Sequence, residues 1–148
     1  MDITKILWPT DFSGNAENAL NYVTELGEKF RTEVHVLYVI EELGEHEPWY
    51  GEFDRSHIDE IHDWERKTAE KRLNEVCENY LKGCPMFVKH IAIGDPAQEI
   101  LNLADQEEVD MIVMASRGRK GRFHFGSVAE KVLKNSTRPV VTIPVPGT

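Results

Sequence analysis

Residues Val34–Ile40 read VHVLYVI, an almost uninterrupted apolar run rich in β-branched side chains. Such a run is typical of a central strand in a parallel sheet that helices cover on both faces. Before it, Ile6-Leu7-Trp8 forms a shorter apolar run that stops at Pro9, which predicts a second buried strand. Apolar residues recur at helical spacing between the two runs, so an amphipathic helix is expected over residues 13–31.

The same alternation of strand and helix patterns continues toward the C-terminus. The remaining predicted elements are a loop over 41–53, a helix from Asp54 to Lys82, a strand over Phe87–Ile93, a helix that begins at Asp95-Pro96, a strand over Met111–Met114, a Gly- and Arg-rich loop over 115–126, a helix over 128–136 and a strand over Val140–Val145. This order predicts one domain, residues 1–148, folded as a three-layer α/β/α sandwich around a five-stranded parallel sheet.

Finer patterns predict strand positions, helix starts and one core stripe. The polar pair Lys89-His90 and the prolines at 139 and 144 place the third and last strands at sheet edges. Asp95 with Gln98, and Ser127 with Glu130, fit capping boxes in which the first residue is the N-cap. The apolar stripe of the long helix, expected to pack in the core, consists of Ile61, Trp64, Leu73, Val76, Cys77 and Tyr80.

Composition argues against several classes of protein. The 148 residues include 17 Lys and Arg against 26 Asp and Glu, a net charge of −9 that disfavours general nucleic-acid binding. No apolar stretch approaches the roughly 20 residues of a membrane helix, so membrane insertion is not expected. The absence of a signal-peptide pattern and the two isolated cysteines predict a reducing, cytoplasmic location. The six histidines form no HxH or HxxxH pair, so structural or surface roles are favoured over metal binding.

Charge is unevenly distributed along the chain. Residues 41–65 contain ten acidic residues and one basic residue, which predicts a solvated acidic surface or a surface for a partner. Four basic residues instead fall within six positions: Arg117, Arg119, Lys120 and Arg122. A basic loop on an acidic protein can attract an anion locally, although a solvated loop is an equally good interpretation.

Ligands of open parallel sheets bind beyond the carboxyl ends of the strands, near the point where strand order reverses. Three segments leave predicted strands there: Pro9–Ser13, Val39–Glu41 and Ala115–Ser127. The last ends in Gly126-Ser127 at a helix N-terminus, where free amides and the helix dipole favour a phosphate group. Asp11 has a simpler alternative role, because it could cap the following helix together with Ser13.

Three stretches resemble one known family. They are KILWPTDFSGNAENAL (5–20), GDPAQEILNLADQEEVDMIVMAS (94–116) and MASRGRKGRFHFGSVAEKVLKNSTRPVVTIPV (114–145). Together they resemble the universal stress protein family, in order and over essentially the whole chain. The resemblance implies an adenine-nucleotide alpha-hydrolase-like fold with strand order 3-2-1-4-5. It also implies a homodimer formed through the last strand, Val140–Val145.

Nucleotide-binding members of the family carry the pattern G-x2-G-x9-G-[ST]. Here Ala115 stands at the first glycine, Gly118 matches the second, and Gly126-Ser127 matches the end after seven intervening residues instead of nine. The resemblance implies ATP with Mg²⁺ as ligand. The site residues that it implies are Pro9 and Thr10 at the floor, Asp11 at the ribose or a phosphate-bound metal, Val39 at the adenine edge, Met114 under the sugar, and Ala115, Arg117, Gly118, Gly126, Ser127 and Val128 around the phosphates.

Three functions are compatible with these observations. The first, which we favour, is a cytoplasmic homodimeric stress-response protein that holds ATP or a related nucleotide. The second is a regulatory dimer of the same fold that acts through protein partners, an interpretation supported by Ala115 and the shortened loop. The third, an enzyme, is weakest, because the chain has no HxGH, SGGxDS-like, GxxxxGK[ST] or GxSxG motif.

Overall fold

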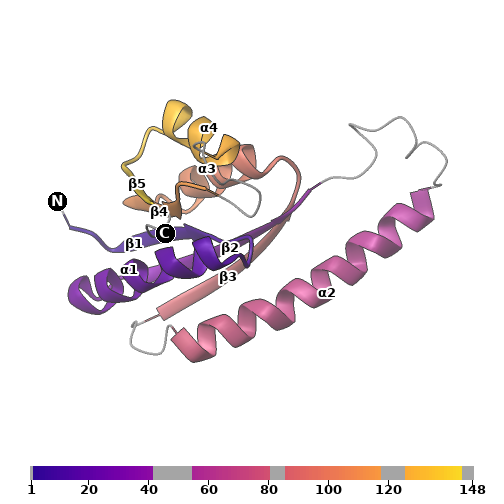
Figure 1. The fold of residues 1–148 in the computed structure, drawn as a ribbon, viewed down its shortest axis with the longest axis horizontal. Helices are drawn as coiled ribbons and strands as arrows, with labels where there is room; N and C mark the ends of the chain where they lie inside the picture. Colours follow the sequence, from indigo (N-terminus) through magenta and orange to yellow (C-terminus); the bar gives the residue numbers. More distant parts are fainter. Residues whose placement is uncertain (1, 42–54, 81–85, 118–125, 145–148) are drawn as a thin grey trace.

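The computed structural model describes residues 2–41, 55–80, 86–117 and 126–144 (Figure 1). Strands and helices alternate through these residues. In chain order they are β1 (Lys5–Pro9), α1 (Gly14–Phe30), β2 (Glu33–Ile40), α2 (Arg55–Tyr80), β3 (Met86–Ile93), α3 (Pro96–Gln106), β4 (Met111–Ala115), α4 (Ser127–Asn135) and β5 (Val140–Ile143).

The five strands form one parallel sheet in the order β3-β2-β1-β4-β5. Leu7 of β1 lies opposite His35 of β2 on one side and Ile112 of β4 on the other. The predicted α/β fold, its strand order and both edge strands are therefore confirmed. β5 ends at Ile143, and Val145 of the predicted strand lies outside the described residues.

Successive strand residues point to opposite faces of the sheet, and each face carries its own core. Ile6 and Trp8 pack with buried side chains of α1 and α2, whereas Leu7 packs with those of α3 and α4. Figure 1 shows α1 on one side of the strands and the α3–α4 pair on the other. The alternation accounts for the nearly continuous apolar runs of the central strands, because side chains on both of their faces meet a helix layer.

Helix α2 packs on the sheet only through its C-terminal half. Ala69, Leu73 and Cys77 are buried there, but Trp64 is 67% exposed and Ile61 is 37% exposed. The prediction that Ile61 and Trp64 belong to the core stripe is therefore wrong. Figure 1 shows the reason, because the N-terminal part of α2 extends away from the other elements and has no layer to pack against.

The observed helix N-termini confirm some of the predicted capping bonds and contradict others. Asp95 caps α3 by accepting a hydrogen bond from the Gln98 amide at 3.0 Å. The reciprocal half of that capping box is wrong, because the Gln98 side chain instead donates to Asn102 Oδ1 at 2.8 Å. In α4 the N-cap is Gly126, with no side-chain capping bond, so the predicted Ser127 cap and its box with Glu130 are also wrong.

A backbone bond explains why α4 begins one residue early. The Gly126 amide donates to the Ser116 carbonyl at 2.8 Å, which holds Gly126 in an extended conformation beside the end of β4. The Gly126 carbonyl then accepts from the Glu130 amide at 2.9 Å, the first bond of the helix. Ser127 is consequently already helical, and its exposed side chain is not needed for the cap.

The Cys77 thiol lies in the core beneath α2 and is fully buried. Burial, reinforced by the charge of Glu78, raises its pKa to about 11, although Lys89 acts in the opposite direction. A buried thiol of this kind is a packing group and not a nucleophile at neutral pH.

Asp110 joins the beginning of β4 to the beginning of β1. Its Oδ2 accepts hydrogen bonds from the Thr4 amide at 2.8 Å, the Thr4 hydroxyl at 3.0 Å and the Lys5 amide at 3.0 Å. Burial acts to raise the pKa of Asp110, but these hydrogen bonds together outweigh it and lower the pKa. A carboxyl group whose pKa is lowered on folding stabilises the native state above its unfolded pKa.

Replacing Asp110 with Asn is expected to lower the free energy of unfolding by about 1 kcal/mol at pH 7, because the bonds lose their charge assistance at a largely solvated position. Urea denaturation of both proteins at pH 7 and pH 3 measures the effect. The difference should shrink at pH 3, because this pH lies below the unfolded pKa of 3.8, where the unfolded chain takes up a proton that native Asp110 resists. An equal difference at both pH values would contradict this assignment.

Candidate functional site

Starting from β1, the chain adds β2 and β3 on one side of the sheet and then β4 and β5 on the other. β1 is followed outward by β2 and β3, and its other neighbour β4 is followed by β5. The point where strand order reverses therefore lies between β1 and β4. The segments that leave β1 and β4 must diverge at their carboxyl ends, which leaves room for a ligand there.

The turn after β1 is built by its own polar side chains. Thr10 is 6% exposed, its amide donates to the Leu37 carbonyl at 2.8 Å, and its hydroxyl accepts from the Phe12 amide at 3.0 Å. Asp11 Oδ1 accepts from the Ser13 amide at 2.9 Å. Ser13 is the N-cap of α1, so Asp11 supports the cap without occupying it. Pro9, Thr10 and Asp11 thus form a fixed ledge at the end of β1.

The segment after β4 is fixed at both ends. The Ser116 amide donates to the Ile143 carbonyl at 2.9 Å, and its carbonyl holds Gly126. The two ends of the loop are thereby brought together beside the N-terminus of α4. Arg117 is half-buried at the start of this loop. Gly118, Arg119, Lys120 and Arg122 lie outside the described residues.

Three apolar site residues converge from different elements. Val39 of β2, Met114 of β4 and Val128 of α4 belong to one packed cluster on the α3–α4 side of the sheet. Ala115 follows Met114 as the last residue of β4, and Ser127 precedes Val128 in the first turn of α4. The first-turn amides of a helix have no intrahelical partners and carry partial positive charge. An apolar wall thus lies next to an anion-favouring helix end.

The ten described site residues fall into two groups, which the topology places at the carboxyl ends of the strands. Pro9, Thr10 and Asp11 form the ledge, and the others surround the β4–α4 connection or adjoin it from β2. Ser116, whose backbone closes this connection, is not among the site residues predicted from the sequence. No side-chain pattern marks it, because both of its bonds are made by the backbone.

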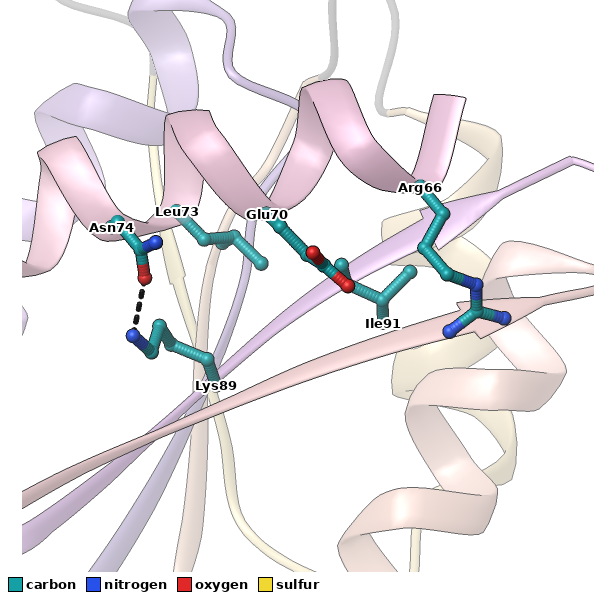
Figure 2. Close-up of a pocket in the computed structure, with 6 residues that line it drawn as sticks. All are labelled: Arg66, Glu70, Leu73, Asn74, Lys89 and Ile91. Atoms are coloured by element: carbon teal, nitrogen blue, oxygen red, sulfur yellow. Dashed lines mark hydrogen bonds between the residues drawn. The ribbon is translucent and has the colours of Figure 1, made fainter. Parts of the chain in front are cut away.

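Two cavities that the described residues outline lie elsewhere. Figure 2 shows the larger, of about 400 Å³, between α2 and β3, with Lys89 Nζ donating to Asn74 Oδ1. It is lined by Arg66, Glu70, Leu73, Asn74, Lys89 and Ile91. The second, of about 340 Å³, lies between α3 and α4. Neither contains a predicted site residue. Residues 118–125 of the β4–α4 connection lie outside the described residues, and the point where strand order reverses remains the candidate site.

Two other features, a metal-binding cluster and a membrane-spanning helix, are absent from the described residues. These residues contain no group of three or more His, Cys, Asp or Glu side chains placed to hold a metal ion. Within the same residues, no helix is both long enough and apolar enough to cross a membrane.

Comparison with known proteins identifies close relatives. A model of the universal stress protein family matches residues 2–144. Universal stress protein MJ0577 of Methanocaldococcus jannaschii is 32% identical over 156 residues, covering 94% of this chain and 93% of that protein. Universal stress protein MJ0531 of the same organism is 31% identical over 147 residues, covering 96% and 82%.

Solved structures agree with this relationship. The structure of the MJ0577 protein matches with a TM-score of 0.87 at 30% sequence identity, covering 100% of each chain. A universal stress protein from Archaeoglobus fulgidus in complex with dAMP matches with a TM-score of 0.66 at 23% identity, covering 97% of this chain and 99% of the other. The family match spans almost the whole length, and two relatives exceed 30% identity over more than nine-tenths of the chain, so this chain belongs to the universal stress protein family.

Proposed function

We propose that this chain is a stress-response protein that binds an adenine nucleotide, ATP with Mg²⁺, at the carboxyl ends of β1, β2 and β4. The observation that carries the proposal is the packing of Val39, Met114 and Val128 beside the N-terminus of α4. A nucleotide has an apolar, stackable base and an anionic phosphate chain, and this arrangement offers one surface for each.

Each site residue then has a role that follows from its place. Val39 presents its backbone to the adenine edge, and Met114 lies under the sugar. Asp11, at the end of β1, faces the ribose or the Mg²⁺ on the phosphates, and its carboxylate suits a hard cation. Pro9 and Thr10 form the floor beneath it.

In this proposal the phosphates bind at the β4–α4 connection. The first-turn amides at Ser127 and Val128 meet them, with Gly126 allowing close approach. Ala115, Arg117 and Gly118 border the same group, and the Arg117 guanidinium supplies a charge-assisted contact. The universal stress protein solved with dAMP supports an adenine nucleotide as the ligand class.

The protein acts as a cytoplasmic homodimer in this proposal, and it is a binding module with no enzymatic turnover beyond slow ATP hydrolysis or self-phosphorylation. β5 is the edge strand nearest the site, and it has a neighbour on one side only, β4, among the described residues. A second copy that pairs there would cover an open strand edge. The segment Val140–Val145 forms this interface.

A regulator without nucleotide is the second candidate. It is favoured by Ala115, whose methyl group occupies the position of the first family glycine, and by the seven-residue spacing between Gly118 and Gly126. A methyl group in place of a hydrogen, and a spacing two residues shorter than the family pattern, both argue against phosphate binding. The two candidates differ in one measurable property, the affinity for ATP.

Calorimetric titration with ATP and Mg²⁺ tests the proposal, with Gly126→Val as the disrupting variant. Gly126 has φ −61° and ψ 140°, a conformation open to any residue, so valine should leave the fold intact. Its branched side chain would stand where phosphate must approach. We expect micromolar binding by the native protein and a loss of at least roughly 30-fold in the variant, about 2 kcal/mol.

Leu133→Val is the matched control, because Leu133 is an exposed residue of the same helix away from the loop. It should bind as the native protein does. No heat and no thermal shift at millimolar ATP in the native protein would reject nucleotide binding in favour of the regulator without nucleotide.

A further inference from the structure

Three ionisable side chains form a continuous hydrogen-bonded row across β2 and β3, remote from the proposed nucleotide site. Glu33 Oε1 lies 2.6 Å from His35 Nε2, and His35 Nδ1 lies 2.8 Å from His90 Nε2. The two imidazole rings are nearly parallel, at 15°, with centroids 5.1 Å apart. The row therefore ties the edge strand β3 to β2 through side chains as well as backbone.

Burial restricts how protons can be placed in this row. His35 is 1% exposed, so its ring nitrogens depend on these two partners. An ionised carboxylate only accepts, so His35 Nε2 must carry a hydrogen toward Glu33. The 2.8 Å contact between His35 Nδ1 and His90 Nε2 then requires one hydrogen between two nitrogens. One added proton leaves this bond intact, because whichever ring is the cation donates to the other; only when both rings are imidazolium ions do two N–H groups face each other and repel.

The surrounding charges relieve that repulsion only in part. Burial, followed by the charge of His35, lowers the pKa of His90, while Glu107 at the end of α3 acts in the opposite direction. From β1, Lys5 lies opposite Glu33 in the sheet register and donates from Nζ to the Glu107 carbonyl at 3.1 Å. A cation thus stands close to the row, together with the two carboxylates Glu33 and Glu107.

We propose that Glu33, His35 and His90 form an acid-sensitive latch, which holds β3 against β2 while one proton is shared between the histidines and releases it when a second proton binds. The strand affected is an edge strand, which can separate without breaking a second strand pairing. β3 is an edge strand bonded to β2 alone within the described sheet. Mild acid is therefore expected to loosen the edge strand β3.

The direction of the pH effect on β3 follows from the linkage between proton binding and strand opening. A histidine whose pKa is lowered in the closed state binds a proton more readily when the strand opens. Protonation thus favours the open strand as pH falls below the unfolded pKa, 6.5. Above that pH the latch contributes fully to holding β3.

Amide hydrogen exchange at pH 7.5 and pH 5.5, corrected for the intrinsic pH dependence of exchange, tests the latch in the intact chain. Protection factors of the β3 amides that face β2 should fall by up to roughly tenfold at pH 5.5, because a free imidazole is about nine-tenths protonated there. Protection in β5 provides an internal control, because this other edge strand contains no histidine.

His90→Gln is the decisive variant. His90 is only half-buried, so the substitution is compatible with folding, and the glutamine amide can donate to His35 Nδ1 without titrating. The variant should keep the protection of β3 at pH 7.5 and lose its decrease at pH 5.5. Native β3 amides that change no more than those of β5, or a variant that loses protection as the native protein does, would overturn the proposal. Nucleotide is absent throughout, so the result is independent of ATP binding.

Discussion

Replacement of Trp8 with alanine is expected to lower the free energy of unfolding by about 4 kcal/mol, the loss typical of a fully buried large aromatic side chain. Trp8 lies at the middle of the sheet, on β1, and has no exposed surface. It packs against buried side chains of both α1 and α2. The two helices cannot both move inward to fill the space, so a cavity would remain.

Urea denaturation followed by circular dichroism measures this loss, and Trp64→Ala is its matched control. Trp64 is the same residue type on α2, but its side chain is largely exposed, so its removal should cost less than about 0.5 kcal/mol. Trp8→Phe should cost less than Trp8→Ala, because Nε1 of Trp8 makes no hydrogen bond with any described residue. Similar losses for Trp8→Ala and Trp64→Ala would contradict the assignment of Trp8 to the core.

The second large effect is expected at the turn between β3 and α3. Gly94 has φ +156°, a backbone conformation that residues with a side chain rarely adopt, and its amide donates to the Ile40 carbonyl at 2.9 Å. An added Cβ would also lie 2.7 Å from Glu99 Oε1. Gly94→Ala should therefore destabilise the protein by about 2 kcal/mol, mostly through backbone strain, because the Glu99 side chain can move.

Gly14→Ala gives the comparison for this substitution. Gly14 opens α1, and an added Cβ would meet nothing within 4 Å. That change should be neutral or should stabilise by up to about 1 kcal/mol, because alanine restricts the unfolded chain. Thermal melts of the two variants should therefore shift in different directions or by clearly different amounts. A Gly94→Ala protein as stable as Gly14→Ala would show that the turn tolerates a side chain.

Much of the fold could be predicted because the central strands are covered on both faces. VHVLYVI and its neighbours are apolar at successive positions, which separates buried parallel strands from the helices between them. Details that depend on backbone bonds could not be predicted. The N-cap of α4 is Gly126 instead of Ser127 because of one bond to Ser116, and the exposure of Trp64 depends on how far α2 extends past the sheet.

The sequence predicts the topology that places the candidate site residues at the carboxyl ends of their strands, and their role in ligand binding stays a prediction. Parallel strands share a direction, so their carboxyl ends lie on the same side of the sheet. This side carries Pro9–Asp11, Val39 and the β4–α4 connection. The row formed by Glu33, His35 and His90 was not predictable. His35 and His90 are 55 positions apart, and their contact depends on the register that places Leu37 opposite His90.

The burial of Cys77 has a consequence for redox chemistry. Oxidants attack the thiolate, and a pKa near 11 leaves roughly one Cys77 in ten thousand ionised at pH 7. The side chain is also closed off from solvent beneath α2. Peroxide therefore has almost no reactive form of Cys77 to convert to a sulfenic acid. The native core on this face of the sheet would keep its packing through an oxidative burst that modifies exposed thiols elsewhere in a cell.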